Sequence, residues 1–312
     1  LVLPTRHGRI LTGLLLLSLL LPLFYAGAAE SSEHTPPSLF FALIIAYVIP
    51  VFSFITAKAQ EALCALRPIL AMDDVDFEQT HARLESGSLR LTLGSLCGGA
   101  LASCVHTVFI SGSVSAAMTT AASGIQGFLT VGGTLMVWLV MTTVISMLIQ
   151  QAVIFGRLGG STVRISLLDT RKLLPFARVS IISSLAIIGT LALFPLINLE
   201  GGLNLAESLP GVVAILGSLI VMFIIPVWPL HKRLVKLKEQ ELTRVFDKID
   251  ASLDDSGAVD LESADIDTFV PLLNYRREIA QLSTWPFDLG NIKTFAFYLI
   301  IPPLTWAGAA LI

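Results

Sequence analysis

Seven long apolar stretches dominate this chain of 312 residues. None contains Asp, Glu, Lys or Arg, and each approaches the roughly 20 helical residues needed to cross a hydrocarbon core. A buried helix of a soluble protein would carry a polar face at helical spacing, and these stretches carry none. We therefore expect an all-α, polytopic membrane helix bundle with about seven transmembrane helices, near Ile10–Ala29, Leu39–Thr56, Leu91–Ile110, Phe128–Phe155, Val179–Ile197, Gly211–Leu230 and Thr294–Ile312.

The composition agrees with a membrane protein and excludes both a nucleic-acid-binding protein and a disulfide scaffold. Hydrophobic residues make up 54% of the chain and charged residues 14%, whereas about a quarter of a soluble domain is charged. The net charge of −3 leaves no basic excess for a nucleic-acid partner. Cys64, Cys97 and Cys104 are too few for a disulfide scaffold and form no CxxC pair.

The basic residues lie on one side of the expected membrane. With seven spans, loops 30–38, 111–127 and 198–210 share a side, and they contain no Lys or Arg. All 20 basic residues, from Arg6 to Lys293, fall on the other side. Loops that stay in the cytoplasm retain Lys and Arg. We therefore expect a cytoplasmic amino terminus and a last span that ends outside.

The first span has the features of a secretory signal peptide. Arg6 and Arg9 precede a leucine-rich run that ends in the small residues Ala26-Gly27-Ala28. We favour a retained signal-anchor helix over a cleaved peptide. Cleavage would leave the orientation of the other six spans unchanged.

The spans divide the chain into three parts. Residues 1–230 are expected to form a transmembrane bundle of six spans, with cytoplasmic loops at 57–90 and 156–178. Residues 231–289 form a cytoplasmic helical segment, and residues 290–312 form the final transmembrane helix.

The first cytoplasmic loop continues the second span as an amphipathic piece. Its apolar side carries Ala62, Leu63, Leu66 and Leu70. An acidic patch follows at Asp73, Asp74, Asp76 and Glu78. We expect a surface helix pair in which an Asp caps the second helix.

The second cytoplasmic loop is strongly basic. Asp169 is its single acid, set against Arg157, Arg164, Arg171, Lys172 and Arg178, and apolar residues are interleaved with them. Such a segment can lie in the interface and attract anionic lipid headgroups through Arg164, Arg171, Lys172 and Arg178. Ordinary positive-inside loop chemistry would give the same composition, so both interpretations stay open.

An amphipathic helix is expected to begin the 231–289 segment. Val235, Leu242 and Ile249 recur every seven residues, with Val245 beside them, and Lys and Glu cover the rest. At about 20 residues the helix is too short for a self-sufficient coiled coil. Its apolar stripe needs a neighbour, which could be the 57–90 segment, a second copy of the chain or another protein.

The turn that follows has some features of a calcium loop, but its ligands are out of register. Aligned on Gly257, the first and twelfth positions are Ser252 and Ser263, where the loop needs carboxylates. We expect an acidic, glycine-containing turn between two helices at 250–263, with no bound metal.

The third span differs from the others because small residues recur every four positions. Gly94, Gly98, Ala102 and His106 share one face, with Ser95, Gly99 and Ser103 beside them, and small residues at this spacing let another helix approach closely. His106 is the only His, Lys, Arg, Asp or Glu in any span. An intramembrane ionisable group is a functional candidate, and the alternative is a neutral imidazole bonded to a neighbouring hydroxyl or carbonyl. Cys97 and Cys104 do not complete a four-ligand metal site with it.

Helix breaks and an interfacial anchor are expected near the last span. We expect Trp285 to anchor the chain at the membrane interface, Pro286 to break the preceding helix and Asp288 to cap the final one. Pro302 and Pro303 remove hydrogen bonds within that span. Broken helices line the sites of many transporters, although proline is also simply frequent in membrane helices.

The same ending carries a resemblance. The residues Tyr275-Arg276-Arg277-Glu278, Trp285-Pro286-Phe287-Asp288 and Ile301-Pro302-Pro303-Leu304-Thr305-Trp306 resemble the end of uncharacterised bacterial multi-span inner-membrane proteins, and the stretch from Glu61 to Leu70 with Arg67-Pro68 fits it too. The resemblance covers about a sixth of the chain. It implies a bacterial inner membrane, with the outer side periplasmic, and implies no activity.

Two surfaces that need neighbours, and no residue pattern that names a chemistry, favour a non-catalytic subunit or scaffold of a membrane assembly. The expected partners are anionic lipids and either a second copy of the chain or other membrane subunits, and no cofactor is expected. The alternative is a channel or small transporter lined by Ser, Thr and Gly of residues 92–134. A coupled carrier is disfavoured because no acidic residue lies within a span. A membrane enzyme is the least favoured, since its groups would have to gather near one plane.

Overall fold

The computed structural model describes residues 7–28, 35–167, 169–193, 196, 205–251, 266–286, 293, 297–298, 300–302 and 304–305. Every long element in these residues is a helix, and six helices are long and apolar enough to cross a membrane. The expected all-α class and multi-pass membrane character are therefore confirmed. The seventh expected span, Thr294–Ile312, lies largely outside the described residues, so the count of seven stays a prediction.

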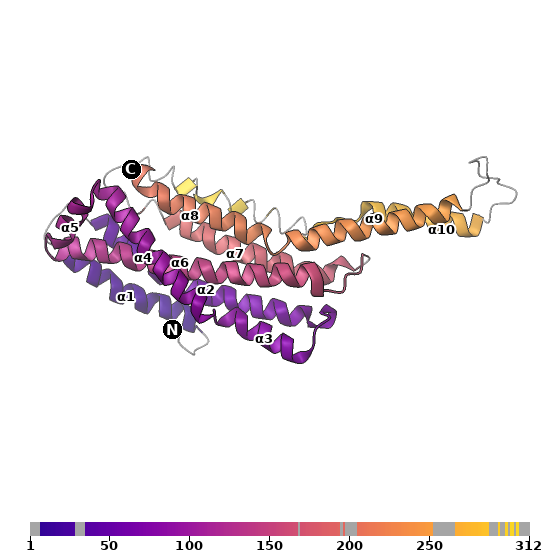
Figure 1. The fold of residues 1–312 in the computed structure, drawn as a ribbon, viewed down its shortest axis with the longest axis horizontal. Coiled ribbons are helices and arrows are strands. Elements are labelled where there is room, and N and C mark those ends of the chain that lie inside the picture. The colour runs from indigo at the N-terminus through magenta and orange to yellow at the C-terminus, as the bar shows by residue number, and fades with distance from the viewer. Residues whose placement is uncertain are drawn as a thin grey trace.

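The six helices run side by side in one bundle (Figure 1), and their bounds are α1 Gly8–Ala28, α2 Thr35–Leu66, α4 Leu89–Ser111, α6 Ile125–Arg157, α7 Leu174–Leu193 and α8 Leu205–Ile224. Helix α2 is central, because α1, α6 and α7 all pack on it. Helix α8 packs on α7, and α4 lies on the outside against α6. The short α5 (Val114–Ala122) covers the end where α4 meets α6.

The membrane part of the bundle has a continuous apolar core. It brings together side chains of α1, α2, α6, α7 and α8, among them Phe24, Phe40, Ile44, Leu148, Ile188 and Met222. Two glycines permit close packing here, since a Cβ at Gly133 would overlap the Phe41 ring and a Cβ at Gly189 would overlap the Tyr47 hydroxyl. The Tyr47 hydroxyl donates to the Ala186 carbonyl at 3.3 Å, so it is satisfied inside the bundle.

A second apolar core lies at the carboxyl-terminal ends of α2 and α6. It includes Ala62, Leu63, Leu66 and Leu70, so the apolar side predicted for the first loop is confirmed as buried. Phe155, Phe176, Leu230 and Leu234 complete it from α6, α7 and the start of α9. Helix α3 (Asp74–Glu85) covers this core with Phe77 and Leu84.

Two local bonding patterns hold this region in shape. The Asp73 side chain accepts from the Asp76 N–H at 2.7 Å, which confirms that an Asp caps the second helix of the loop. An isolated bridge joins the 57–90 and 156–178 loops, since the Ala71 N–H donates to the Thr162 carbonyl and the Arg164 N–H donates to the Ile69 carbonyl. The two loops therefore form one folded unit with η1 (Arg67–Ile69), η2 (Leu158–Thr162) and η3 (Thr170–Leu173).

Helix α8 ends at Ile224, two residues before Pro226, and a serine of α7 bonds the carbonyls at this break. Pro226 has no N–H, so it cannot donate to the Met222 carbonyl one turn earlier. The hydroxyl of Ser180, which is 0% exposed, lies 3.4 Å from that carbonyl and donates to the neighbouring Phe223 carbonyl at 2.6 Å. A freed carbonyl at membrane depth needs such a donor from the protein. Ser180 therefore stabilises the α8–α9 turn.

Beyond this turn the chain leaves the bundle. Helix α9 (Trp228–Asp250) and helix α10 (Ile266–Gln281) form a hairpin that projects from the end of the bundle opposite α5 (Figure 1). The turn at 252–265, which holds most of the calcium-like sequence, lies outside the described residues.

Candidate functional site

Helix α4 packs on α6 through small residues, but not through the predicted ones. Ser95, Gly99 and Ser103 are buried against α6. A Cβ at Gly99 would overlap the Thr142 side chain and would lie 3.0 Å from the Trp138 carbonyl oxygen. The Thr142 hydroxyl donates to that same carbonyl at 2.6 Å and lies 3.1 Å from the Ser95 carbonyl oxygen. The two backbones meet at Gly99 because it has no side chain.

The predicted stripe of Gly94, Gly98, Ala102 and His106 is not a packed face within the described chain. No atom of the described residues lies within 4 Å of a Cβ placed at Gly94 or Gly98, and both glycines are exposed. Ala102 and His106 are half-buried at the edge of the α6 contact. The packed stripe lies one residue further along the helix than the predicted one. Both stripes consist of small residues, so residue size alone could not show which of them faces α6.

His106 lies beside α6 rather than in a polar cluster. Its ring centroid lies 5.6 Å from that of Trp138, at 59°. Its Nδ1 atom is buried, and no hydrogen-bond partner for it occurs in the described chain. The alternative of an imidazole bonded to a neighbouring hydroxyl or carbonyl through Nδ1 is therefore not met in these residues. The described residues contain no group of three or more His, Cys, Asp or Glu that could hold a metal ion.

Several hydroxyls within the spans turn back onto the backbone of their own helix. Thr134, Thr190 and Ser218 each donate to the carbonyl four residues earlier, at 2.9, 3.1 and 2.7 Å. Ser95 donates to the Thr92 carbonyl at 2.9 Å. The Ser184 hydroxyl is fully buried and has no hydrogen-bond partner in the described chain. The hydroxyls of Thr134, Thr190, Ser218 and Ser95 are therefore satisfied by carbonyls of their own helices.

Two adjacent amides at the end of α6 hold helix α3, and the sequence reasoning missed them. Gln151, which is 2% exposed, donates through Nε2 to the Leu84 carbonyl at 2.8 Å and to the Thr56 hydroxyl at 3.0 Å. Gln150 donates to the Arg83 carbonyl at 3.2 Å. Carbonyls of the last helical turn lack an intrahelical donor. In the sequence, the pair of adjacent amides at the end of a long apolar run was the signal that could have indicated this contact.

The basic loop does not lie flat on the membrane through its apolar residues. Val163 and Leu173 are buried in the second core, and Ile165 and Leu167 pack against it. Among the expected lipid contacts, Lys172 forms an ion pair with Asp169 at 2.8 Å, and Arg164, Arg171 and Arg178 are exposed. Their contact with anionic lipid stays a prediction, whereas the apolar face of the loop belongs to the protein core.

The apolar stripe of α9 finds its neighbour within the chain. Helix α10 packs on it, which was none of the three neighbours considered. Val245 is buried, and Val235, Leu242 and Ile249 are half-buried. The Lys238 ammonium donates to the Ala280 and Leu282 carbonyls at 2.7 and 2.8 Å, which closes the end of α10.

A further bond joins the two helices of the hairpin. The Tyr275 hydroxyl of α10 donates to Glu241 Oε1 of α9 at 3.2 Å. Desolvation and the Glu241 carboxylate together raise the pKa of Tyr275, so the phenol keeps its proton and the bond is retained at neutral pH.

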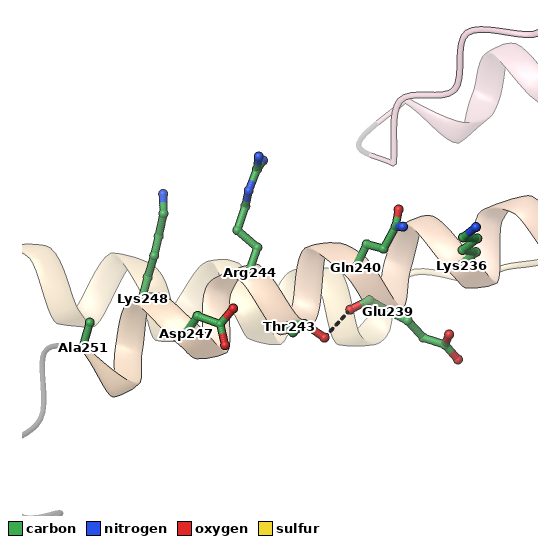
Figure 2. A pocket seen from close by; sticks show the side chains of 8 residues that line it. All are labelled: Lys236, Glu239, Gln240, Thr243, Arg244, Asp247, Lys248 and Ala251. Carbon is green, nitrogen blue, oxygen red and sulfur yellow. Dashed lines mark hydrogen bonds between the residues drawn. The ribbon is translucent and has the colours of Figure 1, made fainter.

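The opposite face of α9 is polar and of mixed charge. Figure 2 shows an open groove whose side chains all come from this one helix, namely Lys236, Glu239, Gln240, Thr243, Arg244, Asp247, Lys248 and Ala251. A groove built by a single helix has no opposing wall, so it does not enclose a small ligand.

Trp285 lies in an aromatic cluster at the base of the hairpin. Its ring stacks on His231, with centroids 3.9 Å apart and planes at 13°, and lies 6.3 Å from the ring of Trp228. His231 Nδ1 lies 3.1 Å from the Thr284 carbonyl oxygen, so the N–H is assigned to Nδ1 as the donor. Pro286 and Pro302 are buried, whereas Asp288 and Pro303 lie outside the described residues.

Comparison of the chain with protein-family models, with curated proteins and with solved structures finds no match.

Proposed function

We propose that this protein is a non-catalytic integral subunit of a membrane assembly, and that α4 forms its contact with a neighbouring subunit. The open face of α4 carries this proposal. Gly94 and Gly98 lie one turn apart beside the exposed Leu101 and Val105, on the outermost helix of the bundle. Small residues flanked by larger apolar ones allow close packing of a helix from another chain. The projecting hairpin supplies a second surface for partners.

The channel alternative has less support. A pore needs polar groups that face a water-filled path, whereas several hydroxyls of the described spans donate to carbonyls of their own helices or of a neighbour. A pore formed between subunits would have to use the face of α4, which is apolar apart from its glycines and cysteines.

Gly98→Leu tests the assembly. We expect the purified wild type to have a mass larger than one chain of 33.5 kDa, and the variant to dissociate without losing thermal stability, because the added side chain meets open space within the chain. Light scattering coupled to size exclusion measures the mass. Gly217→Leu is the matched control, since Gly217 is an equally open, exposed glycine on α8. A wild type that runs as one chain with no bound subunit would contradict the proposal.

We also propose that the protein resides in a bacterial inner membrane, with the α9–α10 hairpin in the cytoplasm. The support is the confinement of all 20 basic residues to one side of the expected spans. In a chain with its native cysteines replaced by serine, an impermeant maleimide should label Ser113→Cys in intact cells. It should label Ala251→Cys only after permeabilisation. Both positions are exposed, and labelling in the opposite order would reverse the orientation.

A further inference from the structure

The start of α9 is basic and lies where the chain leaves the bundle. Helix α8 ends at Ile224, and α9 begins at Trp228 after the Pro226 turn. The first three turns of α9 carry Lys232, Arg233, Lys236 and Lys238, and the first acidic residue of the helix is Glu239. A basic segment directly beside a membrane span meets the headgroup region of the adjoining leaflet.

Three of these residues lie on one face of α9. Trp228, Lys232 and Lys236 follow one another at intervals of four residues, so their side chains lie one above the other along the helix. The Lys232 ammonium is 5.5 Å from the centre of the Trp228 ring. Lys238 is not part of this face, because its ammonium is bound by the carbonyls at the end of α10. Lys236 is also on the polar side of the helix (Figure 2).

Two indole rings adjoin the base of this face. Trp228 is 43% exposed and Trp285 is 41% exposed, and the His231 ring that stacks on Trp285 holds the latter in place. Indole rings prefer the headgroup level of a bilayer, where the ring is in an apolar environment and the N–H can donate. An exposed pair of indoles next to two lysines therefore matches a lipid that has acyl chains below an anionic group.

A nearby guanidinium has an unused donor. Arg233 follows Lys232, and its Nη1 atom is buried with no hydrogen-bond partner in the part of the chain that the structure describes. A buried cationic nitrogen without an acceptor is costly, and no acidic side chain of the described residues pairs with Arg233.

We propose that Lys232 and Lys236, with Trp228 and Trp285 beside them, bind the phosphate headgroup of an anionic phospholipid in the leaflet adjoining α9. The lysines pair with the phosphate, and the indoles lie against the upper part of the acyl chains. The site uses none of the basic side chains of the loop at 156–178, although η2 of that loop packs against the start of α9. It does not depend on the assembly of α4.

Thermal unfolding of the detergent-solubilised full chain tests the site. Phosphatidylglycerol should raise the Tm of the wild type, and phosphatidylcholine should raise it much less. Lys232→Gln/Lys236→Gln should lose at least half of the phosphatidylglycerol shift. The matched control is Arg244→Gln/Lys248→Gln, which removes the same charge from the same helix farther from the bundle (Figure 2), and it should keep the full shift.

Each remaining outcome overturns the proposal. An equal rise in Tm with both lipids would mean that binding does not depend on the charge of the headgroup. An equal loss in the two double variants would mean that the effect is only the net charge of α9. A shift reproduced by glycerol phosphate without acyl chains would assign the site to a free phosphate anion, and the indoles would then have no part in it.

Discussion

Gly99→Leu is expected to destabilise the folded chain by about 3 kcal/mol or more, at the upper end of overpacking effects. The new side chain would meet the Trp138 carbonyl oxygen and the Leu139 Cα atom, which are backbone atoms of α6 that cannot rotate away. Unfolding of the full chain in detergent, followed by circular dichroism, measures the loss. We expect the α4–α6 contact to open first.

The adjacent residue supplies the control for this prediction. Gly98→Leu adds the same side chain one position earlier on α4, where it meets open space within the described chain. This variant should unfold at the wild-type temperature even where it alters assembly. If Gly98→Leu and Gly99→Leu lose equal stability, then α4 is rotated relative to the structure described above.

Phe176→Ala should cost about 3–5 kcal/mol, the usual range for a buried Phe reduced to Ala. Phe176 is 0% exposed and meets Phe155 edge to face, with ring centroids 5.9 Å apart. A Cβ at Gly159 would lie 3.4 Å from the same ring, so the chain after α6 also rests on it. Hydrogen exchange should show loss of protection across 158–173 and α3.

The control for the core variant is Phe128→Ala. Phe128 lies at the start of α6 and is 65% exposed, so its removal leaves no cavity. We expect its effect on the unfolding temperature to be small. A Phe176→Ala protein as stable as this control would mean that the second core does not contribute to the stability of the bundle.

The membrane class could be predicted from the sequence because it depends on the length and apolarity of single segments. Six such segments are helices of the expected length. The apolar side at Ala62, Leu63, Leu66 and Leu70 was also predictable, since helical spacing alone defines it. Each of these features is local, and a local pattern contains enough information to specify it.

The candidate site was less predictable because it depends on which face meets which neighbour. On α4 the stripe containing Gly98 and the stripe containing Gly99 have the same small-residue spacing, and only contact with α6 distinguishes them. The partner of α9 was missed for a similar reason. Helix α10 contains Pro271 and has no long apolar repeat, so its contact with α9 is not apparent from its own sequence.

Any tilt of the α9–α10 hairpin would occur about the α8–α9 turn, where Ser180 bonds the backbone inside the bundle. With 23 residues, α9 is about 34 Å long at 1.5 Å per residue. A tilt of about 10° at the α8–α9 turn would therefore move the far tip of α9 by about 6 Å. The angle at this turn is held by the Ser180 hydroxyl on two carbonyls of α8 and by the burial of Leu230 and Leu234 in the second core. A small change of the angle between α8 and α9 would thus become a displacement of several ångströms at the end of α9 farthest from the bundle.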